Sequence, residues 1–341
     1  MGEAAMPVRV GILGCAQIVE AVLIDPARVT PEIAVVAVAS RDAGRAAAYA
    51  AEHGIPRSYG DYQALLDDPQ VEVVYNPLPN SLHAEWTIRA LEAGKAVLCE
   101  KPLASNAEDA RRMVEAADTA GLPLIEAFHY RYHPVAQFIG DPLRSGLLGR
   151  PRTLAARLKI RGGRMTPDNI RFQPELGGGS TMDLGAYCIN LLRMCVGEEP
   201  TVTAATPTLL SPEIDIAMHA SLAFPGGAVA EFECSHRAER FETWLTLEGE
   251  HGTLRCDNPF LPHRGATVTV EAGGEARTTR FDEPATYVFQ ARALAKIIRE
   301  RAPILTPGAD GIANMAVIDA IYRKAGLAPR LTVGPVRELQ T

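Results

Sequence analysis

The sequence has no cluster of basic residues and no stretch that interleaves basic with aromatic residues, and its 341 residues carry a net charge of −7. A nucleic-acid-binding surface needs such a basic cluster, because it is attracted mainly to phosphates. We therefore expect no nucleic-acid partner. Aromatic residues are also few, at 6% of the chain, so any local concentration of them is informative.

Long apolar runs are absent as well, since no run reaches the roughly 20 residues that a membrane-spanning helix needs. The first residues, Met1 to Met6, lack the charged and apolar regions of a signal peptide. Met6 also occupies the position where an N-myristoylation motif requires Ser or Thr. These absences predict a protein without membrane association, and we expect a cytoplasmic location.

Paired cysteines are also missing, because none of the six cysteines belongs to a Cys-x-x-Cys motif. They stand mostly within apolar runs, which is typical of small buried residues in a reducing compartment. We expect neither disulfides nor a zinc site. The cysteines are Cys15, Cys99, Cys188, Cys195, Cys234 and Cys256.

The chain is longer than one hydrophobic core usually fills, so two domains are expected, and residues 6–127 form the first. In this part short apolar strands alternate with helices, which predicts a doubly wound parallel sheet of the Rossmann type. The expected strands are Val8–Leu13, Ile33–Ala39, Val71–Tyr75, Ala96–Cys99 and Pro123–Ala127, and the expected helices are Ile18–Leu23, Ala43–His53, a short one within Tyr59–Asp67, His83–Ala93 and Ala107–Ala120.

The loop after the first strand keeps one glycine of a Gly-x-Gly-x-x-Gly motif, Gly14, with Ala16 and Val19 at the second and third positions. Ala16 keeps the backbone close to a pyrophosphate, whereas Val19 holds the helix slightly away from the strand. A strand–turn–helix without a ligand also fits this pattern. The predicted dinucleotide contacts here are Gly14, Cys15, Ala16, Gln17 and Ile18.

The second strand ends in Ser40-Arg41-Asp42, where a dinucleotide fold recognises the adenosine ribose. Arg41 offers a planar fork to a 2′-phosphate. Ser40 and Arg41 therefore favour NADP as the cofactor, while Asp42 leaves NAD open. The alternative for Arg41 is a solvated loop arginine.

Open α/β sheets bind ligands beyond the carboxyl ends of their strands. Lys101 follows a buried strand and precedes Pro102, so Lys101 is the first catalytic candidate. The alternative for Lys101 is that Glu100 and Lys101 form a solvated pair. In the loop before the fourth helix, the alternative to a cofactor contact by His83 is helix capping by Asn80 or Ser81. The predicted cofactor contacts at these strand ends are Pro79, Asn80, His83, Glu100 and Lys101.

Aromatic and histidine residues concentrate in Phe128–Pro134. No acidic residue stands there at metal-ligand spacing, so we interpret the segment as a crevice wall and not as a metal site. His129 and Arg131 are its predicted substrate contacts. Arg161, Arg164 and Arg171 are further basic residues that either bind a phosphate or sugar diphosphate or lie on solvated loops.

Residues 128–341 contain eight expected strands joined by hairpin-like turns, which predicts an α+β domain with a large, mostly antiparallel open sheet for substrate binding and oligomerisation. Self-association would cover the face of this sheet that few helices are available to cover. A homodimer or homotetramer is therefore expected. The strands are Leu154–Ile160, Thr201–Thr208, Ile214–Phe224, Ala228–Ser235, Thr243–Glu248, Gly252–Cys256, Ala266–Glu271 and Ala276–Phe281.

One helix, Thr181–Val196, stands among these strands, with Ser180 as its N-cap candidate. Asp183, Tyr187 and Asn190 lie on one face of it. Polar groups on an otherwise apolar helix are costly if they are buried without a role, so Asp183 and Tyr187 join Lys101 as catalytic candidates. Alternatively, Asp183 bonds the first turn of the helix and Tyr187 packs with its hydroxyl in water.

Five segments in order, Gly11–Ala16, Pro79–His83, Glu100–Pro102, Glu126–Phe128 and Gly177–Tyr187, resemble the Gfo/Idh/MocA (glucose-fructose oxidoreductase / inositol dehydrogenase) family over nearly the whole chain. Much of that family has a histidine four residues after the aspartate. The tyrosine here is similar to the branch that contains dihydrodiol dehydrogenase, xylose dehydrogenase and sugar 3-ketoreductases. His129 stands where related enzymes often have Met.

The resemblance implies an NAD(P)-dependent oxidoreductase that moves hydride between nicotinamide and a carbinol or carbonyl carbon of a sugar or sugar-like substrate. Tyr187 would be the acid/base, with its phenolate favoured by Lys101, and Asp183 would orient sugar hydroxyls or hold the lysine. The substrate is either a free aldose or cyclic polyol, or a keto group on a nucleotide-linked sugar. A non-catalytic sensor that binds a dinucleotide is the alternative function.

Overall fold

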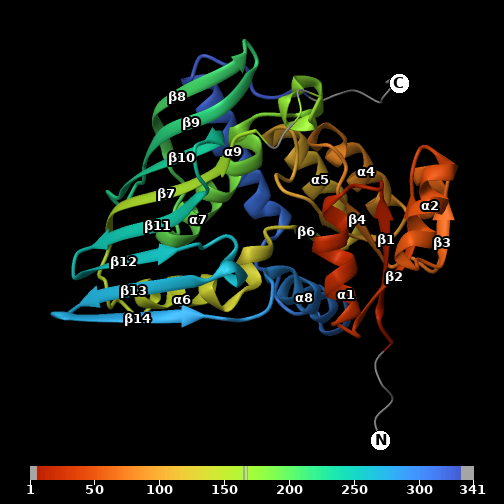
Figure 1. The fold of residues 1–341 in the computed structure, drawn as a ribbon, viewed down its shortest axis with the longest axis horizontal. Helices are drawn as coiled ribbons and strands as arrows, with labels where there is room; N and C mark the ends of the chain where they lie inside the picture. Colours follow the sequence, from red (N-terminus) through yellow and green to blue (C-terminus); the bar gives the residue numbers. More distant parts are fainter. Residues whose placement is uncertain (1–5, 164–165, 167, 332–341) are drawn as a thin grey trace, which may run out of the picture.

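The computed structural model describes residues 6–163, 166 and 168–331, and it places two β-sheets side by side (Figure 1). The first sheet is parallel, with the strand order β3-β2-β1-β4-β5-β6. This order confirms the predicted doubly wound Rossmann sheet. Its strands are β1 (Val8–Leu13), β2 (Ile33–Ala39), β3 (Arg57–Tyr59), β4 (Val73–Asn76), β5 (Ala96–Cys99) and β6 (Leu124–Glu126). The short strand β3 was not predicted, because three residues carry no readable period.

The helices between these strands are α1 (Asp25–Arg28), α2 (Ala43–His53), α3 (Tyr62–Leu66), α4 (Asn80–Glu92) and α5 (Ala107–Ala120). Helices α2 and α5 have the predicted bounds. A π-helical turn, Glu20–Ile24, leads into α1 where a regular helix was expected. Pro26 explains this difference, because it has no amide proton for a regular helical hydrogen bond.

The second sheet has the strand order β14-β13-β12-β11-β7-β10-β9-β8 and is antiparallel except for the pair β7–β10. All eight expected strands are present, so the predicted open sheet is confirmed. They are β7 (Pro151–Arg161), β8 (Thr201–Ser211), β9 (Ile214–Ala223), β10 (Val229–Ala238), β11 (Glu242–Gly249), β12 (Gly252–Asp257), β13 (Ala266–Ala272) and β14 (Glu275–Phe281).

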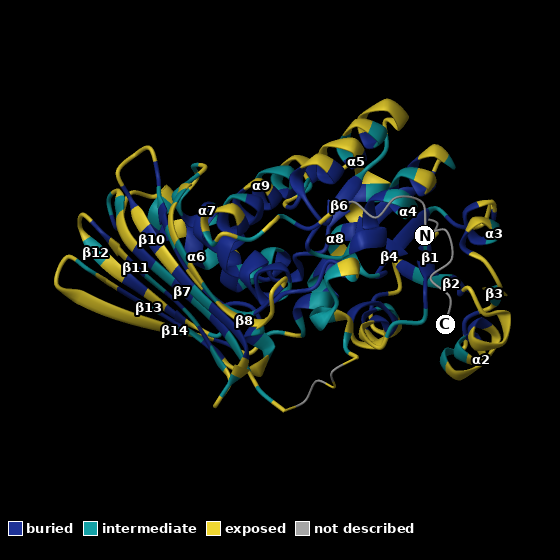
Figure 2. Ribbon diagram, turned by 90° about the horizontal axis from the view of Figure 1, so that it is seen from above, coloured by how far each residue is buried: buried dark blue, intermediate teal, exposed yellow. Residues whose placement is uncertain are grey.

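Helices α6 (Pro134–Arg144), α7 (Ala186–Val196) and α9 (Gly308–Lys324) lie on the side of this sheet that faces the Rossmann sheet (Figure 2). Within the described chain no helix covers the outer face. Polar groups line that face: Arg157 pairs with Glu233 at 2.8 Å and stacks on Trp244 at 4.8 Å. None of the described helices combines the length and apolarity needed to cross a bilayer.

The C-terminal helices α8 (Thr286–Glu300) and α9 were not predicted, and both join the two halves of the molecule. Helix α8 packs beside α1 and β1, and its residues Ala291, Leu294 and Ile297 enter the core of the Rossmann sheet. Helix α9 packs between α5 and strand β8. The two sheets are therefore held together by residues that come last in the chain.

A buried carboxylate fixes the start of the π-helical turn Thr181–Gly185 that leads into α7. Asp215 on β9 accepts hydrogen bonds from Ser180 Oγ at 2.8 Å and from the amide and hydroxyl of Thr181, both at 2.7 Å. Its other oxygen accepts from the Tyr322 hydroxyl at 3.0 Å and pairs with Arg330 at 3.1 Å. Ser180 was expected to cap the helix, but its hydroxyl bonds Asp215 instead.

We predict that Asp215→Ala lowers the free energy of unfolding by about 3–5 kcal/mol, because it leaves Arg330 buried without its carboxylate. The matched control is Asp257→Ala, which breaks a half-exposed pair with Arg255 and should cost about 1 kcal/mol or less. Urea unfolding followed by circular dichroism measures both losses. Equal losses would contradict a structural role for the buried pair.

Candidate active site

Lys101 follows β5 and reaches across to the segment that precedes α7. Its Nζ donates to Oδ1 of Asp183 at 2.7 Å and to the backbone oxygen of Asp183 at 2.8 Å. The two side chains are 11% and 15% exposed, and shielding from water strengthens their attraction. The peptide bond between Lys101 and Pro102 is cis. The structure thus joins two of the three catalytic candidates.

Asp183 has two further partners from other elements. Its Oδ2 accepts from Nε of Arg171 at 2.6 Å and lies 3.0 Å from Nε2 of His236. Burial opposes ionisation, but the charges of Arg171 and Lys101 and the contact with His236 hold the pKa of Asp183 well below its usual range. Asp183 is therefore a carboxylate that bonds these partners and not the first turn of its own helix.

Tyr187 lies one turn beyond Asp183, with its ring against Lys101. Nζ of Lys101 is 4.7 Å from the ring centroid. Burial raises the pKa of Tyr187 well above its usual range, and the nearby Tyr287 and Glu100 raise it further. The pairing of Lys101 with Asp183 works against the expected effect of Lys101 on the phenolate, which stays a prediction.

Two site contacts were not predicted. His236 on β10 bonds Asp183 at 3.0 Å, and Nε2 of His129 lies 3.0 Å from the Tyr187 hydroxyl. The only sequence signal for His236 was a histidine just beyond the expected end of its strand. His129 was predicted as a substrate contact, but it is buried and touches Tyr187.

Arg131 and Asn190 lie in a polar network between α7 and α9. Oδ1 of Asn190 accepts from the Tyr130 hydroxyl at 2.6 Å and from Nη1 of Arg131 at 3.2 Å. Asp310 on α9 accepts from Nδ2 of Asn190 at 3.0 Å and lies 3.5 Å from Arg131. Arg131 was predicted as a substrate contact, but these bonds point it into the interior, toward a helix that was not predicted.

The loop after β4 is clamped to the segment that follows Lys101. His83 is fully buried, with Nδ1 3.0 Å from the Pro102 oxygen and Nε2 2.8 Å from the Leu78 oxygen. Both ring nitrogens thus contact backbone oxygens of the protein, and the predicted contact of His83 with a cofactor stays a prediction. Asn80 donates to the Gly177 oxygen at 2.9 Å and does not cap α4, which starts after Pro79 without a side-chain cap.

The loop Gly14–Ile18 follows β1, and Gly14 has a φ of 82°, which favours glycine. A Cβ at Gly14 would also lie 3.1 Å from Leu78. Arg45 donates to the Cys15 oxygen at 3.1 Å, so this arginine stands beside the loop.

Ser40 and Asp42 lie at the end of β2, next to the exposed Arg41. Asp42 is occupied as the N-cap of α2, where it accepts from the Arg45 amide at 2.9 Å. Ser40 Oγ accepts from the Asp42 amide at 3.3 Å. Asp42 is thus already bonded, whereas the exposed guanidinium of Arg41 lies beside the Tyr62 hydroxyl.

The other basic residues that were predicted to bind a phosphate differ in their surroundings. Arg171 pairs with Asp183 while its side chain stays 40% exposed, and Arg161 is exposed at the end of β7. Arg164 lies outside the described residues.

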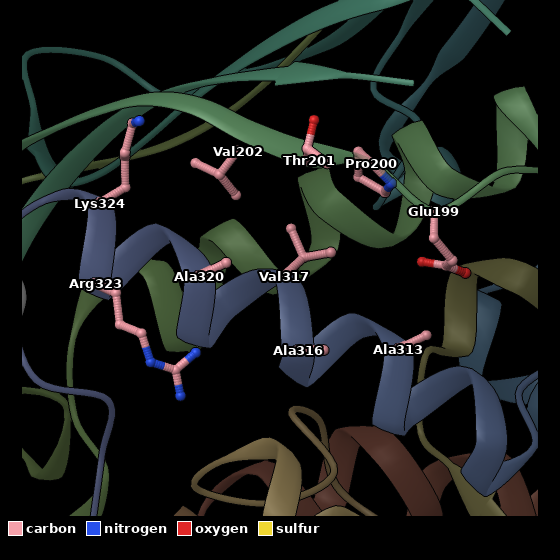
Figure 3. Close-up of a pocket in the computed structure, with 10 residues that line it drawn as sticks. All are labelled: Glu199, Pro200, Thr201, Val202, Ala313, Ala316, Val317, Ala320, Arg323 and Lys324. Carbon is pink, nitrogen blue, oxygen red and sulfur yellow. The ribbon is translucent and has the colours of Figure 1, made fainter. Parts of the chain in front are cut away.

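A separate groove of about 640 Å³ lies between α9 and β8 (Figure 3). Small residues of α9 form its floor, and Lys101, Asp183 and Tyr187 do not line it. Its lining residues are Glu199, Pro200, Thr201, Val202, Ala313, Ala316, Val317, Ala320, Arg323 and Lys324.

Comparisons with known proteins match both halves of the chain. Residues 8–128 match the family model described as an oxidoreductase family with an NAD-binding Rossmann fold, and residues 139–255 match the GFO/IDH/MocA C-terminal domain. D-xylose 1-dehydrogenase (NADP(+)) 2 of Haloferax volcanii is 35% identical over 321 residues, which are 92% of this chain and 96% of that protein.

Two further relatives act on or bind nucleotide-linked compounds. The dTDP-3,4-didehydro-2,6-dideoxy-alpha-D-glucose 3-reductase of Saccharopolyspora spinosa is 35% identical over 95% of this chain and 98% of that protein. A 3-ketoreductase from Actinomadura kijaniata, whose crystal structure contains NADP and TDP-benzene, has 29% sequence identity to this chain. The two structures match with a TM-score of 0.82 over 92% of this chain and 97% of that chain.

Glu126, at the end of β6, holds the backbone that follows Lys101. Its Oε1 accepts from the Leu103 amide at 2.8 Å, while no group among the described residues bonds Oε2. Burial raises the pKa of Glu126 to about 8, and Asp310 also raises it. Burial therefore favours the protonated form of this carboxyl group.

We predict that Glu126→Gln becomes more stable relative to wild type as the pH rises. The folded-state pKa of about 8 exceeds the unfolded value of about 4.3, so folding takes up a proton between these values and wild-type stability falls as the pH rises through them. The difference in unfolding free energy should change by at most about 1.4 kcal/mol per pH unit. Urea titrations at several pH values measure it, with the exposed Glu92→Gln as control; a difference that does not vary with pH would contradict the buried proton.

Proposed function

The chain belongs to the Gfo/Idh/MocA family of oxidoreductases, and on this basis we propose that it transfers hydride between NADP(H) and a carbinol or carbonyl carbon of a sugar or sugar-like substrate. One observation supports this most: the Lys101–Asp183 pair lies against Tyr187 at the end of β5. A non-catalytic sensor would not need an ammonium, a carboxylate and a phenol in contact.

The residues near β1 and β2 fit a dinucleotide. Only a glycine fits well at position 14. The backbone of the loop Gly14–Ile18 could then come close to a pyrophosphate and bind it through its amide groups. Arg41 and Arg45 would receive a 2′-phosphate, and Glu100, Pro79 and Asn80 lie at the strand ends beside Lys101. When bound, the nicotinamide would supply or accept the hydride.

The raised pKa of Tyr187 suits a role as the proton donor. In the reducing direction the O–H bond of Tyr187 breaks and a new O–H bond forms on the substrate oxygen. Lys101 would stabilise negative charge as it develops on that oxygen. Asp183 would hold Lys101 in place, because its second carboxylate oxygen is itself fixed by contacts with Arg171 and His236.

The substrate we propose is a free aldose or polyol. Two of the arginines that were candidates for binding a sugar diphosphate already pair with carboxylates of the protein, Arg131 with Asp310 and Arg171 with Asp183. The xylose dehydrogenase from Haloferax volcanii supports the same substrate class. A homodimer or homotetramer and a cytoplasmic location stay predictions.

We predict that Tyr187→Phe lowers turnover by about 100-fold or more, because the proton donor is lost, while the dissociation constant for NADPH changes little. Absorbance of NADPH in both directions across aldoses, polyols and keto-sugar nucleotides measures turnover. The control is Tyr130→Phe, another buried tyrosine, whose hydroxyl bonds Asn190. If turnover of the Tyr187→Phe variant stays within about threefold of wild type, Tyr187 is not the proton donor.

We also predict that Arg41→Ala weakens NADPH binding by about 10- to 100-fold, since a hydrogen bond to a charged group is worth about 1.5–3 kcal/mol, and leaves NADH binding almost unchanged. Fluorescence titration of the two cofactors measures both constants. Arg28→Ala, on α1, is the control for loss of an exposed arginine. An equal loss for NADPH and NADH would show that Arg41 does not read the 2′-phosphate.

A further inference from the structure

The contact between His129 and Tyr187 belongs to this chain's own site and has no role in the reaction described above. Nε2 of His129 lies 3.0 Å from the Tyr187 hydroxyl. The His129 ring is 4% exposed and packs on Tyr287 at a centroid distance of 4.3 Å. In this packing Nε2 faces the hydroxyl.

The environment of the ring selects which nitrogen carries the proton. Burial lowers the pKa of His129 to about 3, and the charge of Lys101 lowers it too, so the ring is neutral and carries one proton. No group among the described residues bonds Nδ1. A proton on Nδ1 would leave a buried N–H donor without a partner, which is rarer in proteins than an unpaired acceptor. The proton therefore belongs on Nε2.

From this geometry we propose that His129 is a positioning residue that donates a hydrogen bond from Nε2 to the Tyr187 oxygen, which leaves the Tyr187 proton free for the substrate. The proposal rests on the proposed function of Tyr187. As the O–H bond of Tyr187 breaks and the substrate O–H bond forms, the acceptor becomes a phenolate. A hydrogen bond to a charged oxygen is roughly twice as strong as one to a neutral oxygen, so His129 stabilises the state that follows proton transfer.

A donor to the Tyr187 oxygen is needed because the surroundings of Tyr187 disfavour its phenolate. The charged and titratable groups around Tyr187 and His129 come from several elements, and the acidic ones raise the pKa of Tyr187. Lys101 is compensated by Asp183, so the His129 N–H is the hydrogen-bond donor that reaches the oxygen itself. The surrounding groups are Glu100, Lys101, Tyr130, His133, Arg171, Asp183, His263 and Tyr287.

The first test follows kcat for sugar oxidation against pH, where Tyr187 must accept a proton. His129→Met keeps a side chain of similar size without a donor, and we expect kcat at neutral pH to fall about 10-fold or more. The pH at which kcat rises should move up by about one unit. The KM for the sugar should stay within about threefold, because the proposed hydrogen bond of His129 goes to Tyr187 and not to the sugar.

Two further variants separate donation from packing. His129→Gln offers an amide N–H near the same place and should restore most of the rate and the pH profile. His133→Asn is the matched control, because His133 is also buried but caps α6 through Val135, a task that Asn performs well. A His129→Gln variant as slow as His129→Met would overturn the proposal, and so would a higher KM with an unchanged pH profile.

The second test needs no substrate. Nitrogen-15 NMR of the histidine side chains reads which nitrogen is protonated, and the His129 signal is assigned by its loss in His129→Gln. We expect the Nε2–H form, with a signal that shifts in Tyr187→Phe. A proton on Nδ1 overturns the proposal. If the Nε2–H form is found but wild type oxidises no sugar, the contact stands and only the proposed reaction fails.

Discussion

The carboxylate of Asp183 is the group on which the arrangement of the site depends. It neutralises Lys101 at 2.7 Å while Arg171 and His236 approach its second oxygen at 2.6 and 3.0 Å. These partners come from the segment after β5, from the segment before α7 and from β10. A buried carboxylate with so many donors is held rigidly, because each donor removes a direction in which the side chain can turn.

This constraint also determines how Lys101 acts on Tyr187. Burial raises the pKa of Tyr187 well above its usual range, and an ammonium already paired with a carboxylate attracts a phenolate weakly. The π-helical turn at Thr181–Gly185 belongs to the same arrangement, because it places the Asp183 backbone oxygen within 2.8 Å of Lys101. Turns of this kind often occur at functional sites.

Much of the fold was predictable because hydrophobic periodicity survives in a single sequence. Strands β7, β11, β12 and β13 alternate buried residues with more exposed ones, and Lys101, Asp183 and Tyr187 stand out by strand-end or helical spacing. The direction of Arg131 was not predictable, since its partner Asp310 lies 179 positions along the chain on a helix without a clear period. The contacts of His129 and His236 depend on tertiary packing that spacing does not encode.

Helix α8 has a consequence for how the protein is made. Ala291, Leu294 and Ile297 complete the apolar core that Val8, Val10 and Ile12 begin, although nearly 300 residues separate them. The apolar core of the first sheet is therefore complete only after α8, near the end of the chain, has been synthesised.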